Sequence, residues 1–83
     1  MDKEEKIIRY EKIVERLRNI SDKIDILETH LDDLKVLNEE TLKINGSGVG
    51  RNNITSAYSY VDSASNVINN TIIPRLENKI ENC

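Results

Sequence analysis

Only a few residues of this 83-residue chain have the chemistry of a catalyst. His30 is the single histidine. A helix would place it beside the carboxylate of Asp33, and such a pair can serve as a general base. No cysteine or positioned serine lies nearby for that base to activate. Because Leu27, Leu31 and Leu34 surround it in sequence, we predict that His30 is a histidine of the surface or of the rim of an interface, and that the chain is not an enzyme.

Metal and cofactor sites have equally little support in the sequence. A metal site needs several convergent ligands, whereas Cys83 is the only cysteine and stands at the last position. A glycine-rich loop that binds phosphate follows a strand and ends in lysine, whereas here Arg51 follows the glycines. We therefore predict a turn between helices at Gly46, Gly48 and Gly50, with no catalytic residue, cofactor or metal.

The charge balance argues against nucleic acid and membranes as ligands. The chain carries 12 basic and 15 acidic residues, a net charge of −3, whereas a phosphate-binding surface needs surplus lysine and arginine. The longest aliphatic runs are pairs such as Ile7-Ile8, which excludes direct insertion into a membrane. Residues 1–6 do not begin a secretory signal. We expect a cytoplasmic protein, or one exported by a route that reads no such signal.

The first half of the sequence has the repeat of one long helix. Its apolar residues follow steps of three and four, which is the spacing of a helix that packs along a seam. They are Tyr10, Ile13, Leu17, Ile20, Ile24, Leu27, Leu31 and Leu34. Asp2 can cap this helix, and Gly46 can end it because glycine adopts the left-handed conformation without a Cβ penalty. The pattern predicts a helix over about 3–44.

The second half predicts a weaker helix over about 52–81. Its apolar residues also recur at steps of three or four: Ile54, Tyr58, Val61, Ala64, Ile68, Ile72, Leu76 and Ile80. The positions between them are mostly Ser, Asn and Thr, which compete for backbone hydrogen bonds. Asn52 or Asn53 is expected to cap the helix. Pro74 lacks a backbone donor, which predicts a kink or a break near residues 70–73.

Two long helices joined by a short turn at about 45–51 predict an all-α fold, a single helical hairpin with coiled-coil-like antiparallel packing. One seam cannot cover all the apolar positions, so the hairpin is expected to complete a four-helix or larger bundle. The partner is expected to be a helical protein, in a hetero-oligomer or a homodimer. The predicted seam and partner residues are Ile13, Leu17, Ile20, Ile24, Leu27, Leu31, Leu34, Ile54, Tyr58, Val61, Ile68, Ile72 and Leu76.

An acidic hairpin of this size with glycines in its turn resembles the WXG/LXG superfamily of type VII (ESX-type) secretion. Residues 58–62 and 69–76 are similar to the second helix of small partners of LXG effectors. The Trp-x-Gly motif of the superfamily is absent, and Gly48 or Gly50 stands at its glycine position. Tyr58 and Asp62 have the spacing of the family's export signal, but they fall in the first half of the second helix instead of near its end.

The resemblance implies a non-enzymatic chaperone or targeting factor. Such a protein would pair with the helical N-terminal region of a type VII effector or with a sibling hairpin. Two other functions also fit an acidic hairpin. One is an antitoxin or immunity protein that masks a basic toxin by helix-in-groove binding. The other is a structural coiled-coil adaptor without any link to secretion.

Overall fold

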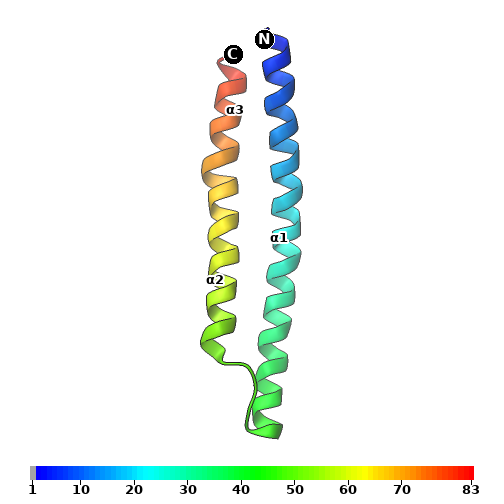
Figure 1. Ribbon diagram of the computed structural model, residues 1–83, viewed down its shortest axis with the longest axis vertical. Coiled ribbons are helices and arrows are strands. Elements are labelled where there is room, and N and C mark those ends of the chain that lie inside the picture. Colours follow the sequence, from blue (N-terminus) through cyan, green and yellow to red (C-terminus); the bar gives the residue numbers. More distant parts are fainter. Residues whose placement is uncertain (1) are drawn as a thin grey trace.

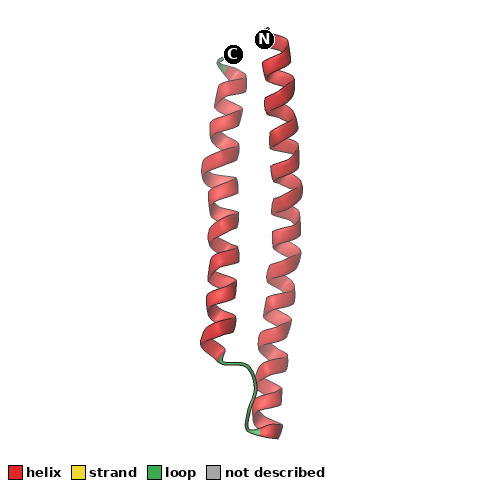
Figure 2. Ribbon diagram, in the orientation of Figure 1, coloured by secondary structure: helices red, strands yellow, loops and turns green. Residues whose placement is uncertain are grey.

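The computed structural model describes residues 2–83, which form two helical arms lying side by side (Figure 1). The first arm is α1, Lys3–Asn45. The second arm consists of α2, Arg51–Val67, a π-helical turn, Ile68–Ile72, and α3, Ile73–Glu81. Figure 2 shows helix throughout both arms and a single loop between them. The predicted all-α helical hairpin is confirmed, with extents of 63 × 15 × 15 Å.

Local chemistry at both ends of α1 explains its length. The backbone N–H of Glu5 donates to Asp2 Oδ1 at 2.8 Å, so one free donor of the first turn is satisfied. At the other end Gly46 adopts the left-handed conformation, with φ 72°. Its N–H donates to the Leu42 carbonyl at 2.9 Å. Both the cap and the glycine stop were predicted, and both are confirmed.

The second arm begins without a side-chain cap. Gly50 occupies the capping position, and no side chain accepts from the first turn of α2. The expectation that Asn52 or Asn53 caps this helix is wrong, because the helix starts at Arg51 and both asparagines lie inside its first turn. An uncapped helix rich in Ser and Asn has little stability of its own. The second arm therefore depends on packing against α1.

The disruption expected at residues 70–73 is a π-helical turn and not a break in the arm. In this turn the backbone N–H of Ile73 donates to the carbonyl of Ile68, five residues earlier. Pro74 follows directly and has no N–H to donate. The wider turn admits one additional residue, as π-helical turns do.

The additional residue changes which side chains of α3 face the first arm. The seam positions from Ile54 to Ile72 alternate steps of four and three, and the next two steps of this alternation would place Arg75 and Lys79 in the seam. The π-helical turn shifts the pattern by one position, so that Leu76 and Ile80 become the half-buried residues instead. Lys79 stays at the edge, with Nζ 5.9 Å from the centroid of the Tyr10 ring. The π-helical turn therefore keeps the end of the seam apolar.

The seam residues of the second arm are the ones that the sequence predicted. All of them are buried or half-buried: Ile54, Tyr58, Val61, Ile68, Ile72 and Leu76. On α1 the predicted Leu17, Ile24 and Leu31 are also half-buried. The most buried apolar side chains are Val14, Ile54 and Ile73, at 9%, 6% and 4% exposure. Two polar residues, Ser21 and Asn38, are buried with them.

The prediction that the other four residues of α1 lie in the seam is wrong. The residues concerned are exposed: Ile13, Ile20, Leu27 and Leu34. α1 is rotated so that the row containing Val14 and Ser21 faces the second arm in their place. The Ser21 hydroxyl accepts a hydrogen bond from Asn69 Nδ2 at 2.8 Å, and Asn38 binds the loop. Because these polar groups have partners inside the seam, they can be buried there.

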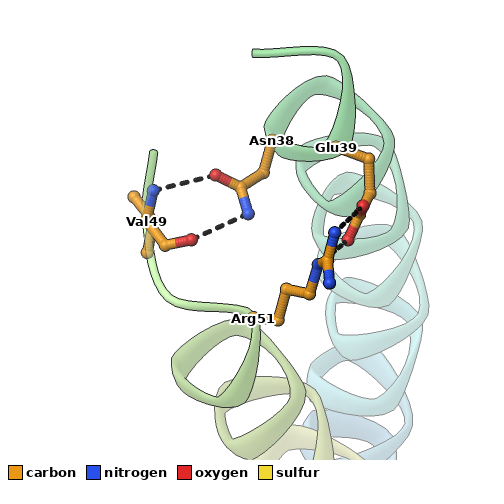
Figure 3. A network of polar contacts seen from close by, with 4 residues as sticks. All are labelled: Asn38, Glu39, Val49 and Arg51. Atoms are coloured by element: carbon orange, nitrogen blue, oxygen red, sulfur yellow. Dashed lines mark hydrogen bonds and ion pairs between the residues drawn. The ribbon is translucent and has the colours of Figure 1, made fainter. Parts of the chain in front are cut away.

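A pair of polar contacts holds the loop against α1 (Figure 3). Asn38 Nδ2 donates to the Val49 carbonyl, and the Val49 N–H donates to Asn38 Oδ1, both at 2.8 Å. Arg51 Nη2 donates to Glu39 Oε2 at 2.8 Å. A Cβ atom at Gly48 would lie 2.5 Å from Asn38 Oδ1, so the close approach requires glycine. Asn38 was not among the predicted site residues, although it follows the seam residue Leu31 by seven positions, which marks it as a polar seam position.

Candidate helix-docking face

One row of large aliphatic side chains on α1 is left uncovered by the second arm. Its members are seven residues apart, so they lie in one line along the helix. They are Ile13, Ile20, Leu27 and Leu34, with 46%, 46%, 46% and 41% of their surface exposed. The row extends over about 32 Å, since a helix rises about 1.5 Å per residue. Exposed apolar rows of this length are typical of interaction sites.

The second arm carries a matching exposed row that is built from smaller residues. Ala57 and Ala64 are exposed, and each follows a seam residue of its own arm by three positions. Beside them, Tyr60 and Val67 expose 77% and 51% of their surface. The small side chains allow the backbone of another helix to come close, because the distance between helix axes depends on the side chains at the contact.

Both rows lie on the same face of the hairpin. On each arm the exposed row follows the seam by three positions, so it is displaced in the same rotational sense. Because the arms face one another and run in opposite directions, these rotations bring both rows to one side. The Ser21–Asn69 hydrogen bond sets the register and places Leu27 near the level of Ala64. We call this surface the open face, and its residues are Ile13, Ile20, Leu27, Leu34, Ala57, Tyr60, Ala64 and Val67.

A groove of about 340 Å³ has a different chemistry. Residues of both arms line it: Leu31, Asp32, Lys35, Ile54, Thr55, Tyr58, Ser59 and Asp62. Asp32 and Asp62 lie on the side of their arms that the open face does not use, so the groove belongs to the opposite face. Tyr58 and Asp62, the predicted export signal, therefore share one surface feature. Tyr58 is half-buried and Asp62 is exposed.

Carboxylates gather beside this groove and perturb the titration of their neighbours. Glu28 is half-buried, and its Oε1 is closed off without a hydrogen-bond partner among the described residues. Desolvation raises the pKa of Glu28 above its ordinary value of 4.5, and the charges of Asp62, Asp25 and Asp32 raise it further. Glu28 and the other carboxylates also raise the pKa of the Tyr58 hydroxyl. This side of the hairpin is therefore strongly negative.

We expect Glu28→Gln to raise the melting temperature of the chain at neutral pH. A raised pKa means that the folded chain binds this proton more tightly than the unfolded chain. Ionisation of Glu28 therefore lowers stability as pH rises from 4.5 through the raised pKa. Glutamine removes that effect, so the gain should vanish below pH 4.5, where Glu28 is itself protonated. Circular dichroism melts of both proteins from acidic to neutral pH measure it.

The matched control is Glu15→Gln, the same change at an exposed carboxylate of α1. This variant removes the same charge at a position that has no neighbour in the seam. Its melting temperature should therefore equal that of the unmodified chain at each pH. An equal gain for Glu15→Gln and Glu28→Gln would assign the effect to net charge and contradict the role of the buried Oε1.

The remaining residues with reactive chemistry do not come together. His30 is exposed on α1, and Cys83 is a half-buried free thiol at the far end of the second arm. Among residues 2–83 no group of three His, Cys, Asp or Glu side chains is placed to hold a metal ion. None of the described helices combines the length and the apolar character that crossing a membrane requires.

No protein-family model matches the chain, and neither a curated protein nor a solved structure matches it. The surfaces that distinguish this hairpin are the apolar open face and the acidic groove opposite to it.

Proposed function

We propose that the chain is a non-enzymatic helical partner protein that works by packing its open face against helices of another protein. The open face is the observation that carries the proposal. The chain exposes 6371 Å², whereas a compact monomer of 9.5 kDa exposes about 5,000 Å². The surplus exceeds the roughly 800 Å² that one protein contributes to a standard interface. A docked helix would cover the apolar part of this surplus.

The resemblance to the WXG/LXG superfamily supports a particular class of partner within this proposal. The partner would be the helical N-terminal region of a type VII secretion effector, or a sibling hairpin, and the chain would act as its chaperone or targeting factor. In that case Tyr58 and Asp62 would remain accessible on the opposite face while the open face is covered. The export role of this pair stays a prediction.

Leu27→Asp tests the proposal, since it places a charge at the centre of the open face. Leu27 is 46% exposed, so the hairpin should stay folded and lose about 0.5 kcal/mol or less. The bound helix should be lost, because an interface core does not tolerate an unpaired charge. The tagged full chain is purified from its native cell, and the protein that co-purifies with it is identified. The measured quantity is the amount of that protein retained by each variant relative to the unmodified chain.

The matched control is Ile26→Asp, the same change at a side chain that is 60% exposed and lies on the far side of α1 from the seam. This variant should retain the partner at the level of the unmodified chain. A retained protein with a long helical N-terminus would support the secretion class, and a small basic nuclease would point to an antitoxin. Equal retention by the Leu27→Asp chain would rule out the open face as the docking surface.

A further inference from the structure

We infer that the open face selects a helix whose apolar stripe is flanked by acidic residues. The inference rests on the proposed function and adds the charge of the partner. The row next to the aliphatic row on α1 consists of exposed residues that follow Ile13, Ile20, Leu27 and Leu34 by three positions: Arg16, Lys23, His30 and Leu37. Arg9 precedes Arg16 by seven positions and continues the same row toward the N-terminus. Ile20 lies in a shallow depression whose lining includes Lys12, Arg16 and Lys23 and one acid, Glu15. Of these cations, Arg16 and Lys23 border the middle of the open face, whereas Lys12 shares the row of Ile26 on the far side of α1.

Two of these cations are free to pair with a partner. Arg9 is bound to Glu5 on its own helix at 3.2 Å. Arg16 and Lys23 form no ion pair within the described part of the chain. They lie seven residues apart, so they follow the aliphatic row in a parallel line. Carboxylates at the same spacing on a docked helix would meet both of them.

Along α2 the second arm adds no negative charge to the open face, and Glu77 of α3 is already paired with Arg18 at 2.7 Å. Between Arg51 and Arg75 its only charged residue is Asp62, and Asp62 lies at the groove of the opposite face. An acidic helix would therefore meet cations on the open face, and at the groove it would meet Glu28 and Asp32. Charges arranged in this way set the orientation and the choice of a partner more than they raise affinity.

The charge pattern favours a different protein over a second copy of this chain. A second copy would present its own open face, which carries the same cations and no carboxylate to pair with them. Arg16 and Lys23 would then stay without partners in the dimer. The small side chains of Ala57 and Ala64, beside the large side chains of α1, leave room for a single helix to come close to the second arm. A partner helix of about 20 residues would match the length of the aliphatic row.

The test uses two synthetic helical peptides as probes of the full chain. Both carry the same leucine stripe, and the positions beside the stripe hold glutamate in one peptide and lysine in the other. We expect the glutamate peptide to bind about fivefold more tightly at low salt, because two exposed ion pairs contribute about 1 kcal/mol together. Added salt should reduce the difference. Amide shifts in an NMR titration should locate the bound peptide along residues 13–34.

Charge reversal provides the decisive comparison. The double variant Arg16→Glu with Lys23→Glu should prefer the lysine peptide. Its matched control, Lys35→Glu with Lys43→Glu, changes the net charge equally but lies off the open face, and it should keep the preference for glutamate. Equal affinities for the two peptides, an unchanged preference after reversal at Arg16 and Lys23, or shifts centred on the acidic groove would overturn the inference.

The remaining outcomes separate this inference from the proposed function. If the native partner is captured through Leu27 but is insensitive to reversal of Arg16 and Lys23, only the charge rule fails. If sedimentation equilibrium shows a homodimer that Leu27→Asp dissociates, the occupant is a second copy, and the inference is wrong. If neither peptide binds and no protein is captured, both proposals fail.

Discussion

Ile73→Asp is expected to unfold the hairpin. Ile73 is 4% exposed, the most buried apolar side chain of the seam, and it stands directly after the π-helical turn. An unpaired carboxylate at a buried position costs several kcal/mol. A domain of this size has only about 3–5 kcal/mol of stability from its core. Far-UV circular dichroism at room temperature should therefore show the helical signal largely lost.

The control for this variant is Ile44→Asp, which introduces the same charge at a side chain that is 83% exposed in the last turn of α1. It should keep the helical signal of the unmodified chain. If Ile73→Asp melted like Ile44→Asp, Ile73 could not face the first arm, and the shift that the π-helical turn imposes on α3 would be wrong.

Asn38→Asp should destabilise the hairpin by about 2 kcal/mol, the cost of leaving a buried group unsatisfied. The change is nearly isosteric, but it replaces the amide Nδ2, which donates to the Val49 carbonyl at 2.8 Å, with an acceptor oxygen. Two acceptors would then face each other at a residue that is only 6% exposed. Unfolding in urea measures the loss, and the loop at residues 46–50 should become more susceptible to proteases.

Asn66→Asp is the matched control, because Asn66 is exposed on α2 and the change in charge is the same. Its free energy of unfolding in urea should stay within about 0.5 kcal/mol of the value for the unmodified chain. An Asn38→Asp chain as stable as Asn66→Asp would show that the contact between α1 and the loop contributes nothing, and that the loop is held by Arg51 and Glu39 alone.

The ends of α1 were predictable because short-range chemistry decides them. The side chain of Asp2 accepts a hydrogen bond from the N–H of Glu5, only three residues later. Gly46 can take the left-handed conformation that ends the helix. Two helices with a short loop between them have to lie antiparallel. The hairpin therefore follows from residues that are close in the sequence.

The rotation of α1 about its axis could not be predicted in the same way. Apolar rows of the first helix lie side by side, and a repeat in the sequence does not say which two of them the second arm covers. Ser21 and Asn38 decide it through hydrogen bonds to Asn69 and Val49, which lie 48 and 11 residues away. The candidate site depends on this rotation, because it leaves Ile20 and Leu27 exposed.

The form of the helix around Pro74 was likewise decided by tertiary packing. The sequence alone determined where the regular pattern is disturbed, because a proline has no N–H for the preceding turn. It did not determine whether the arm would break or widen. Packing against α1 favours a π-helical turn, since one additional residue places Leu76 and Ile80 in the seam and leaves Lys79 at its edge. Local chemistry thus determined the elements and their ends, whereas contacts between distant residues decided which faces are buried and which remain open to a partner.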